Sequence, residues 1–275
     1  MSKDSKKLDK KIRAVSKIIK ITNAMKVIAS MKIKKLSSQV KQGKEIFTHL
    51  QMILGTLHSI LVSEYSKLKN FSPENKTFWI VYTSDLGLCG AYNTHIFKKL
   101  QAMIKVKDKL FVVGKKGINH FKFQNQNIID SSASRTFDMI KIQKLIGEII
   151  KGYQVNWNRV VIIFSKCSKE LKIETTTQTL LPISLSDEWK SFPSINEFIV
   201  EPDVETVYKN SQQLYLQLNL YNFFYEARLA EEVSRRLSME NANENAKEMV
   251  RDLKLKYNQI RQENITREIL EISEN

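Results

Sequence analysis

The chain has 275 residues, of which 42% are hydrophobic and 27% are charged, with a formal net charge of +15. This composition is typical of an ordinary soluble protein of one or two domains, and no apolar run approaches the roughly 18 residues that a membrane span needs. Two cysteines exclude a disulfide framework, and segment 1–11 lacks the apolar core of a secretory signal. The sequence therefore predicts a reduced, intracellular protein.

The positive charge is concentrated near the N-terminus. Residues 1–44 carry fourteen Lys or Arg and two Asp, a net charge of +12, which leaves +3 for the other 231 residues. One interpretation is a basic coiled-coil protein that binds nucleic acid with steeply salt-dependent affinity. The other is a solvated helix face, or a face toward an acidic protein partner. Because no aromatic residue for base stacking precedes Phe47, composition favours the second interpretation.

The first predicted element is a long amphipathic helix over about residues 5–61, which contain no proline. Its apolar residues recur at steps of three and four, which places them on narrow stripes of a helix. One stripe contains Leu8, Ile12, Val15, Ile19 and Thr22, and a neighbouring stripe contains Ile18, Ile21, Met25 and Ile28. Gly43 and Gly55 are expected where the stripe ends and the helix packs on a globular part. Pro73 disfavours helix for the residue before it, so the N-terminal helical domain is predicted to span 1–72.

Between residues 73 and 204 the pattern changes to short apolar, β-branched runs that alternate with helical patterns. Such runs are typical of strands that are buried on both faces. Strands are predicted at 78–82, 110–114, 128–129, 160–164 and 171–180, and helices at 96–103, 115–121 and 139–150. This alternation predicts a compact, mostly parallel, Rossmann-like α/β domain. The segment 182–202 is interpreted as a linker to the next element.

The longest predicted element is a helix from about Glu205 to Ile272, a stretch with neither glycine nor proline. At 1.5 Å per residue it would form a rod of roughly 100 Å, which a domain of this size cannot bury from end to end. Its narrow stripes are typical of a coiled-coil seam. They contain Phe223, Ala227, Ala230, Ser234, Leu237 and Asn241, then Ala242, Ala246, Met249, Leu253, Tyr257 and Ile260. This helix forms the third predicted domain, 205–275.

The apolar stripes of the two long helices each lack a partner elsewhere in the chain. We therefore predict that the N- and C-terminal helices form an antiparallel coiled coil, with the α/β domain as a head at one end. In this arrangement, Ile19 is expected beside the stripe between Leu253 and Ile260.

The turn Gly87–Gly90 lies after a strand and before a helix, where α/β folds bind phosphate. It has neither the three glycines of a dinucleotide motif nor the Gly-Lys-Ser/Thr ending of a P-loop. A small α/β enzyme with its site here would need a base beside Cys89, and His95 is expected on the surface of the following helix. The histidines also lack the spacing of metal ligands. We interpret the segment as a packing turn and predict no catalytic, cofactor or metal site and no small-molecule substrate.

Three blocks of sequence, spread along nearly the whole chain, point to a particular family. They are Ile12–Lys17 with Ile21–Ser30, then Ser84–Gly90, and finally Arg235–Met239, Asn245–Ala246, Tyr257–Gln262 and Ile265–Ile272. In content, order and spacing, these blocks resemble those of the γ subunit of the F-type ATP synthase. The plan of helix, head and helix is also the plan of that family.

The resemblance implies a rotor shaft that itself makes and breaks no bonds. In that family the coiled coil stands inside a hexamer of alternating α and β subunits, and the head sits with the ε subunit on a membrane ring of c subunits. Proton flow turns the ring and the shaft, which drives the catalytic β subunits through their conformations. The implied location is the cytoplasmic face of a bacterial inner membrane or, alternatively, the matrix side of the mitochondrial inner membrane.

The match to the family motif also implies five contact residues for the β subunit. Gln262, Thr266 and Glu268 would contact a loop of the catalytic β subunit. Arg235 would join them, facing Met25 and its neighbours on the other helix. The alternative interpretation of these polar residues is a solvated helix face.

The chain departs from the family pattern in two places. It ends in Ser273, Glu274 and Asn275, where the family often has a small apolar tail, so the resemblance implies no contact for this tip. Ala91 and Tyr92 follow the glycine turn, where many members have a third glycine and an aliphatic residue. The chain also lacks the cysteine-bearing insertion of the chloroplast form, which argues against thiol regulation.

Overall fold

The computed structural model describes residues 3–65, 76–123, 128–132, 139–153, 155–168, 172–183 and 201–273. Two long helices, α1 (Lys3–Tyr65) and α5 (Val204–Ser273), flank the head, as the sequence predicts. Between them the described residues form α2 (Tyr92–Gln101), α3 (Lys115–Phe123), α4 (Met139–Gly152), β1 (Thr77–Tyr82), β2 (Lys109–Val113), β3 (Ile128–Ser132), β4 (Arg159–Cys167) and β5 (Ile173–Leu181). The predicted class, an α/β head between two long helices, is therefore confirmed.

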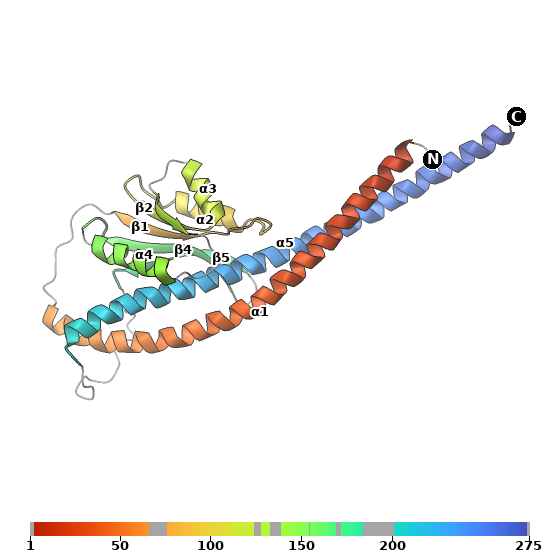
Figure 1. Cartoon of the computed structure of the whole chain (residues 1–275). Coiled ribbons are helices and arrows are strands. Elements are labelled where there is room, and N and C mark those ends of the chain that lie inside the picture. The colour runs from red at the N-terminus through yellow and green to blue at the C-terminus, as the bar shows by residue number, and fades with distance from the viewer. Residues whose placement is uncertain are drawn as a thin grey trace.

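Helices α1 and α5 run antiparallel and lie side by side, as predicted (Figure 1). Lys26 Nζ lies 2.7 Å from Glu240 Oε1, whereas Lys44 Nζ lies 2.6 Å from Glu226 Oε1. Higher residue numbers on α1 therefore pair with lower numbers on α5. Both chain ends lie at the same end of the molecule, where the pair extends beyond the head as a two-helix rod (Figure 1).

The register between the two helices differs from the predicted one. Asn243 Nδ2 donates hydrogen bonds to Ile19 O at 3.0 Å and to Thr22 Oγ1 at 2.9 Å. Ile19 thus lies opposite Asn243, which precedes the stretch from Leu253 to Ile260 by at least ten residues. The predicted pairing of Ile19 with that stretch is wrong, because an apolar repeat alone is compatible with several registers and a buried polar pair selects one.

Small and polar side chains occupy much of the seam between the helices. Buried positions include Thr22 and Ala29 on α1, and Met239, Asn243 and Ala246 on α5. Leu237 and Met249, which the sequence pattern placed on the seam, are exposed instead. Since the distance between helix axes depends on the side chains at the contact, small residues allow α1 and α5 to approach closely.

The described residues of the head form a five-stranded sheet in the order β3-β2-β1-β4-β5. β1 pairs in parallel with β2 and β4, β2 pairs in parallel with β3, and β5 is antiparallel to β4. This is the mostly parallel, Rossmann-like sheet that the alternating pattern predicts. β5 runs antiparallel because only a short connection separates it from β4, and a parallel crossover needs a dozen or more residues.

Successive residues of the central strand β1 face opposite sides of the sheet, and each side has its own hydrophobic core. Phe78 and Ile80 pack in the core with α4 and α5, whereas Trp79 and Val81 pack in the core with α2 and α3. Figure 1 shows these two pairs of helices on opposite sides of the sheet. Helix α5 contributes Tyr215, Leu216, Leu220, Phe224 and Ala227 to its core. It is therefore an element of the head as well as of the rod.

Two absences hold for the described residues. No helix among them is both long enough and apolar enough to cross a membrane. The same residues include no group of three or more His, Cys, Asp or Glu that could hold a metal ion. The predicted linker 182–202 falls largely outside the described residues.

Candidate functional site

The far end of α5 carries three of the five predicted contact residues. Gln262 and Thr266 lie about one turn apart and are exposed, and Thr266 Oγ1 donates a hydrogen bond to Gln262 O at 3.0 Å. An open hollow on this surface is lined by Gln259, Gln262, Glu263, Thr266, Arg267 and Leu270. Glu268 belongs to the same stretch, but its side chain lies outside the described part of the structure. This end of α5 therefore exposes polar side chains together with the apolar Ile265, Ile269 and Leu270.

Met25 lies on a stripe of α1 that α5 does not cover. It is 37% exposed, and its neighbours Ile18 and Ile21 are 48% and 57% exposed. The adjacent Lys26 pairs with Glu240, so Met25 lies near the level of Glu240 on α5. A two-helix seam needs only one stripe of each helix, which leaves this second apolar stripe at the surface.

Arg235 lies apart from the contact residues at the end of α5. It is separated from Gln262 by 27 residues of one continuous helix, about 40 Å at 1.5 Å per residue. It is also buried, with an exposed fraction of 6%. Any contact that Arg235 makes with a partner is thus separate from the contact of Gln262 and Thr266.

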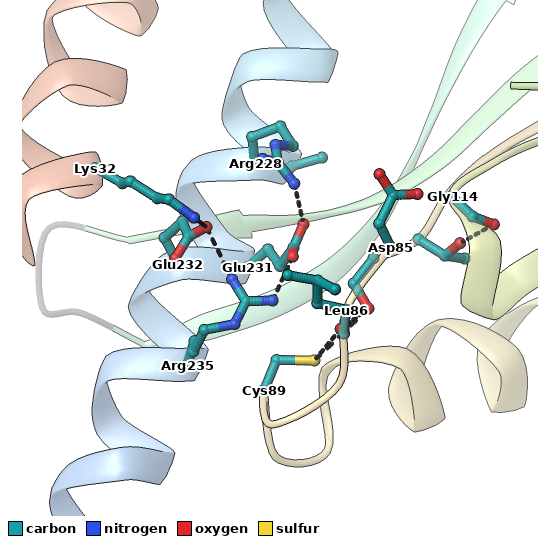
Figure 2. Close-up of polar contacts among 12 residues, drawn as sticks. Lys32, Asp85, Leu86, Cys89, Gly114, Arg228, Glu231, Glu232 and Arg235 are labelled. Carbon is teal, nitrogen blue, oxygen red and sulfur yellow. Dashed lines mark hydrogen bonds and ion pairs between the residues drawn. The ribbon is translucent and has the colours of Figure 1, made fainter. Parts of the chain in front are cut away.

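Four charged residues gather around Arg235 where α5 passes both α1 and the head, which makes a group of five (Figure 2). Arg235 Nη2 lies 2.5 Å from Glu231 Oε1, and Arg235 Nη1 lies 2.8 Å from Glu232 Oε1. Arg228 Nη1 binds the other carboxylate oxygen of Glu231 at 2.9 Å. From α1, Lys32 Nζ binds Glu232 Oε1 at 3.0 Å. We call these five residues the charge cluster.

The carboxylates of the charge cluster stabilise the charged form of Arg235. Burial alone would lower the pKa of Arg235, but the charge and hydrogen bond of Glu231, followed by those of Glu232, raise it overall. Glu231 and Glu232 are almost completely buried. A buried carboxylate without a partner is strongly unfavourable, so the cluster fixes the side chains that compose it. Lys32 is the member that ties α1 to the group.

The turn Ser84–Gly90 has the geometry of a packing turn rather than of an active site. The hydrogen-bond partners described for Cys89 Sγ are Ser84 Oγ at 3.7 Å, Leu86 O at 3.9 Å and Asn93 Nδ2 at 3.6 Å. None of these groups is a base, and burial raises the pKa of the Cys89 thiol. A nucleophilic cysteine needs the opposite environment, so this geometry gives no support to a small enzyme with its site at the turn.

Three hydroxyl groups join the head to α5, a role that the sequence analysis gave to none of them. Their bonds run from Tyr82 OH to Leu220 O (3.1 Å), from Tyr92 OH to Ala227 O (3.0 Å) and from Ser234 Oγ to Cys89 O (2.7 Å). Tyr82 was predicted only as a strand residue, because a strand pattern does not say which helix crosses the strand. The sequence did mark Tyr92 as unusual, since this hydroxyl-bearing aromatic residue stands where many family members have an aliphatic residue.

Comparison with known proteins assigns the chain to a family. The family described as ATP synthase matches residues 4–274. The ATP synthase gamma chain of Mycoplasma mobile is 34% identical in an alignment of length 274 that covers 97% of this chain and 96% of that protein. The chain belongs to the ATP synthase gamma-chain family. The gamma chain of Mycoplasmopsis pulmonis is 35% identical, also over 97% of this chain and 96% of its own length.

Solved rotors of ATP synthases share the fold of this gamma chain. The rotor of the Euglena gracilis mitochondrial ATP synthase aligns with a TM-score of 0.70 at 17% identity, over 95% of this chain and 99% of that chain. A central stalk and c-ring structure from Tetrahymena thermophila aligns with a TM-score of 0.63 at 21% identity, over 81% of this chain and 99% of that chain. At these identities, the likeness establishes the fold alone.

Family membership confirms the predicted identity and class. A gamma chain is a non-catalytic subunit of the central stalk of the F-type ATP synthase, and the reaction itself takes place on the β subunits. The family is that of a membrane-associated F1 complex. The matched relatives give no support to the alternative of a nucleic-acid-binding coiled coil.

Proposed function

We propose that this gamma chain is the central rotor shaft of a proton-translocating F-type ATP synthase. Its task is to couple rotation of the membrane ring to conformational changes at the catalytic β subunits. The two-helix rod beyond the head carries the proposal (Figure 1). On α5, most described residues from 247 to 270 are exposed. This part of the rod therefore leaves a large surface free for contact with surrounding subunits.

The proposed partners lie at opposite ends of the molecule. The rod would stand inside the hexamer of α and β subunits, and the head would contact the ε subunit and the c-ring. The Tetrahymena structure joins a central stalk to a c-ring, and a Euglena structure with a TM-score of 0.64 contains F1 and the c-ring, which supports this arrangement. We propose no nucleic-acid partner and no small-molecule substrate for this subunit.

We propose a division of the chain into the three parts 1–72, 73–204 and 205–275. The first and third form the shaft, and the second forms the head. Helix α5 overlaps this division, because its residues 215–227 pack in the core of the head before the helix continues into the rod.

We propose that Met25, Gln262, Thr266 and Glu268 contact the β subunit. The exposure of Met25, Gln262 and Thr266 supports this, since polar contacts at a mobile interface can be exchanged as the shaft turns. Arg235, the fifth residue of the predicted contact, would contribute separately by fixing the shaft from within, because its guanidinium is occupied by Glu231 and Glu232.

We propose that the complex lies at the cytoplasmic face of a bacterial inner membrane. Bacterial relatives support this location, including the gamma chain of Campylobacter lari at 31% identity over 97% of this chain. The alternative is the matrix side of a mitochondrial inner membrane.

Purification of the full-length chain from its native membranes tests the proposed function. We expect two larger nucleotide-binding subunits to copurify with it, and ATP-driven proton uptake by the membranes to depend on its presence. Recovery of the chain with DNA or RNA at physiological salt, and without those two subunits, would contradict the proposal and support the basic coiled-coil alternative.

A further inference from the structure

The hydroxyl contacts between the head and α5 follow a regular interval along the helix. On α5 they use Leu220 O, Ala227 O and Ser234 Oγ, which are seven residues apart in sequence. Seven residues are about two turns, or roughly 10 Å along the axis, so all three atoms lie on one face of α5. The head is therefore joined to α5 at three points over about 20 Å of helix.

The two tyrosine hydroxyls are permanent donors. Tyr82 and Tyr92 are buried, and burial raises the pKa of both phenols above their usual value, so both stay protonated at neutral pH. Each donates to a carbonyl oxygen within α5. Because a carbonyl oxygen has two lone pairs, the helix keeps its own hydrogen bond at the same residue.

These bonds oppose motions that the apolar core resists only weakly. The hydrophobic effect is non-directional and depends on buried area, so it holds α5 on the sheet without fixing the angle of the helix about its own axis. A hydrogen bond weakens steeply when its angle changes. Three such bonds along one face therefore resist both rotation of α5 about its axis and sliding of α5 along the sheet.

The third bond lies close to the point where α5 leaves the head. Ala230 is the last α5 residue in either described core, and Ser234 lies one turn beyond it. Ser234 is next to Arg235, so this bond adjoins the charge cluster, which binds α1 through Lys32 (Figure 2). Beyond this level the two helices continue as the rod.

We propose that the hydroxyls of Tyr82, Tyr92 and Ser234 form a latch that transmits torque between the head and the shaft. The inference rests on the proposed function, because torque has a meaning only in a rotating subunit. The three are positioning residues, which contact no substrate and fix the angle of α5 relative to the sheet.

The test removes all three hydroxyls from the assembled ATP synthase. A variant with Tyr82→Phe, Tyr92→Phe and Ser234→Ala is compared with the wild type in inverted membrane vesicles, where ATP hydrolysis and ATP-driven proton uptake are both measured. We expect normal assembly and hydrolysis, with the ratio of proton uptake to hydrolysis reduced about threefold or more, since each lost bond favours unlatched arrangements by a factor of roughly 2–10. The control Tyr257→Phe removes a phenol from α5 beyond the head and is expected to leave the ratio unchanged.

A disulfide at the same place separates torque transmission from folding. A Cβ built on Gly90 lies 3.8 Å from Ser238 Cβ, which is the usual spacing across a disulfide. Gly90→Cys and Ser238→Cys are therefore added to the triple variant, together with Cys89→Ser to remove a competing thiol. We expect the ratio to recover in the oxidised vesicles and to fall again after reduction with dithiothreitol. The reduced sample carries the same substitutions, including any strain from the positive φ of Gly90, and is the matched control.

Each outcome bears on the latch. A wild-type ratio in the triple variant overturns it, and so does a reduced ratio that the disulfide does not restore. Failure of the triple variant to assemble also counts against it, because the hydroxyls would then serve folding. If the proposed function itself were wrong, the result would be different, because wild-type vesicles would then show no proton uptake that depends on this chain.

Discussion

Glu232 and Glu226 both lie on α5 and both form an ion pair with a lysine of α1, but they differ in their surroundings. The Glu232 side chain is 1% exposed and binds Arg235 as well as Lys32. In the pair of Glu226 with Lys44, the glutamate side chain is 14% exposed and the lysine side chain is 63% exposed. Exposed pairs contribute little because water competes for both charges, whereas a buried charge depends on its partner. Burial therefore decides which charged residues hold the shaft together.

We expect Glu232→Gln to lower the free energy of unfolding by about 1–3 kcal/mol, since a buried guanidinium loses one of its carboxylate partners. Glu231 still pairs with Arg235 and limits the loss. The control Glu226→Gln is expected to change the free energy of unfolding by only about 0–1 kcal/mol. Urea unfolding of the purified chains measures both values. Equal losses for the two variants would contradict the assigned role of burial.

Removal of a polar side chain at the end of α5 is expected to impair coupling more than folding. Gln262→Ala and Thr266→Ala each delete hydrogen-bonding groups worth about 0.5–1.5 kcal/mol at the proposed β contact, and Met25→Lys places a charge on an exposed apolar stripe. In membranes carrying these variants we expect ATP hydrolysis to persist and ATP-driven proton uptake to fall.

The exposed Asn258 on the same helix supplies the control for this segment, as Asn258→Ala should leave both activities unchanged. If all three contact variants assemble and retain wild-type hydrolysis and proton uptake, the residues have no part in the proposed contact.

At the scale of elements, a glycine lies where α1 crosses α5. A Cβ built on Gly43 would lie 2.0 Å from Asn222 Oδ1, which is closer than real Cβ atoms approach other atoms, and 3.4 Å from Tyr221 Cε1. Both Gly43 and Asn222 are buried. The sequence pattern marked Gly43 only as the end of an apolar stripe. In the structure this glycine lets α1 lie directly against α5 beside the head.

We expect Gly43→Ala to destabilise the chain by roughly 1 kcal/mol, because the cost of overpacking exceeds the gain in helix propensity. Gly147 provides a matched comparison within α4, as a Cβ built there meets no atom within 4 Å. Gly147→Ala is expected to stabilise the chain by about 0.4–1 kcal/mol. Thermal unfolding of the two variants should therefore show shifts of opposite sign, and shifts of the same sign would refute the close-approach argument.

At the scale of the whole molecule, the register of α1 against α5 sets how far the rod extends beyond the head. Buried polar contacts fix this register at two levels, Asn243 with Thr22 in the rod and Glu232 with Lys32 beside the head. Because a coiled coil with an apolar repeat can slip by whole repeats, such specific pairs determine one length and one orientation.

Cross-linking measures the register directly. In a background with Cys89→Ser and Cys167→Ser, the pair Thr22→Cys and Asn243→Cys is expected to cross-link efficiently with a short bifunctional reagent. The pair Ile19→Cys and Ile260→Cys is the control and should not cross-link, since these positions lie about 17 residues, or roughly 25 Å, out of register. The reverse pattern would show that the helices pair as the apolar stripes alone suggest.

The sequence by itself determined the elements, their order and the family. Hydrophobic periodicity predicted both long helices and the antiparallel pair, and buried β-branched runs predicted β1, β2 and β4. The three sequence blocks identified the gamma-chain family, because a motif is a property of residue order. These features depend on neighbours within a few residues, and such local information is present in a single sequence.

Only the tertiary structure decided which residues meet across the molecule. Arg235 matched the family motif together with Gln262, yet it lies buried in the charge cluster about 40 Å away along α5. The register, the close approach at Gly43 and the hydroxyl bonds of Tyr82 and Tyr92 were likewise not evident from the sequence. The physical reason is that a stripe pattern specifies a helix face but not its partner's position along the axis. Contacts between residues more than a hundred positions apart are selected by the combined packing of α1, the sheet and α5.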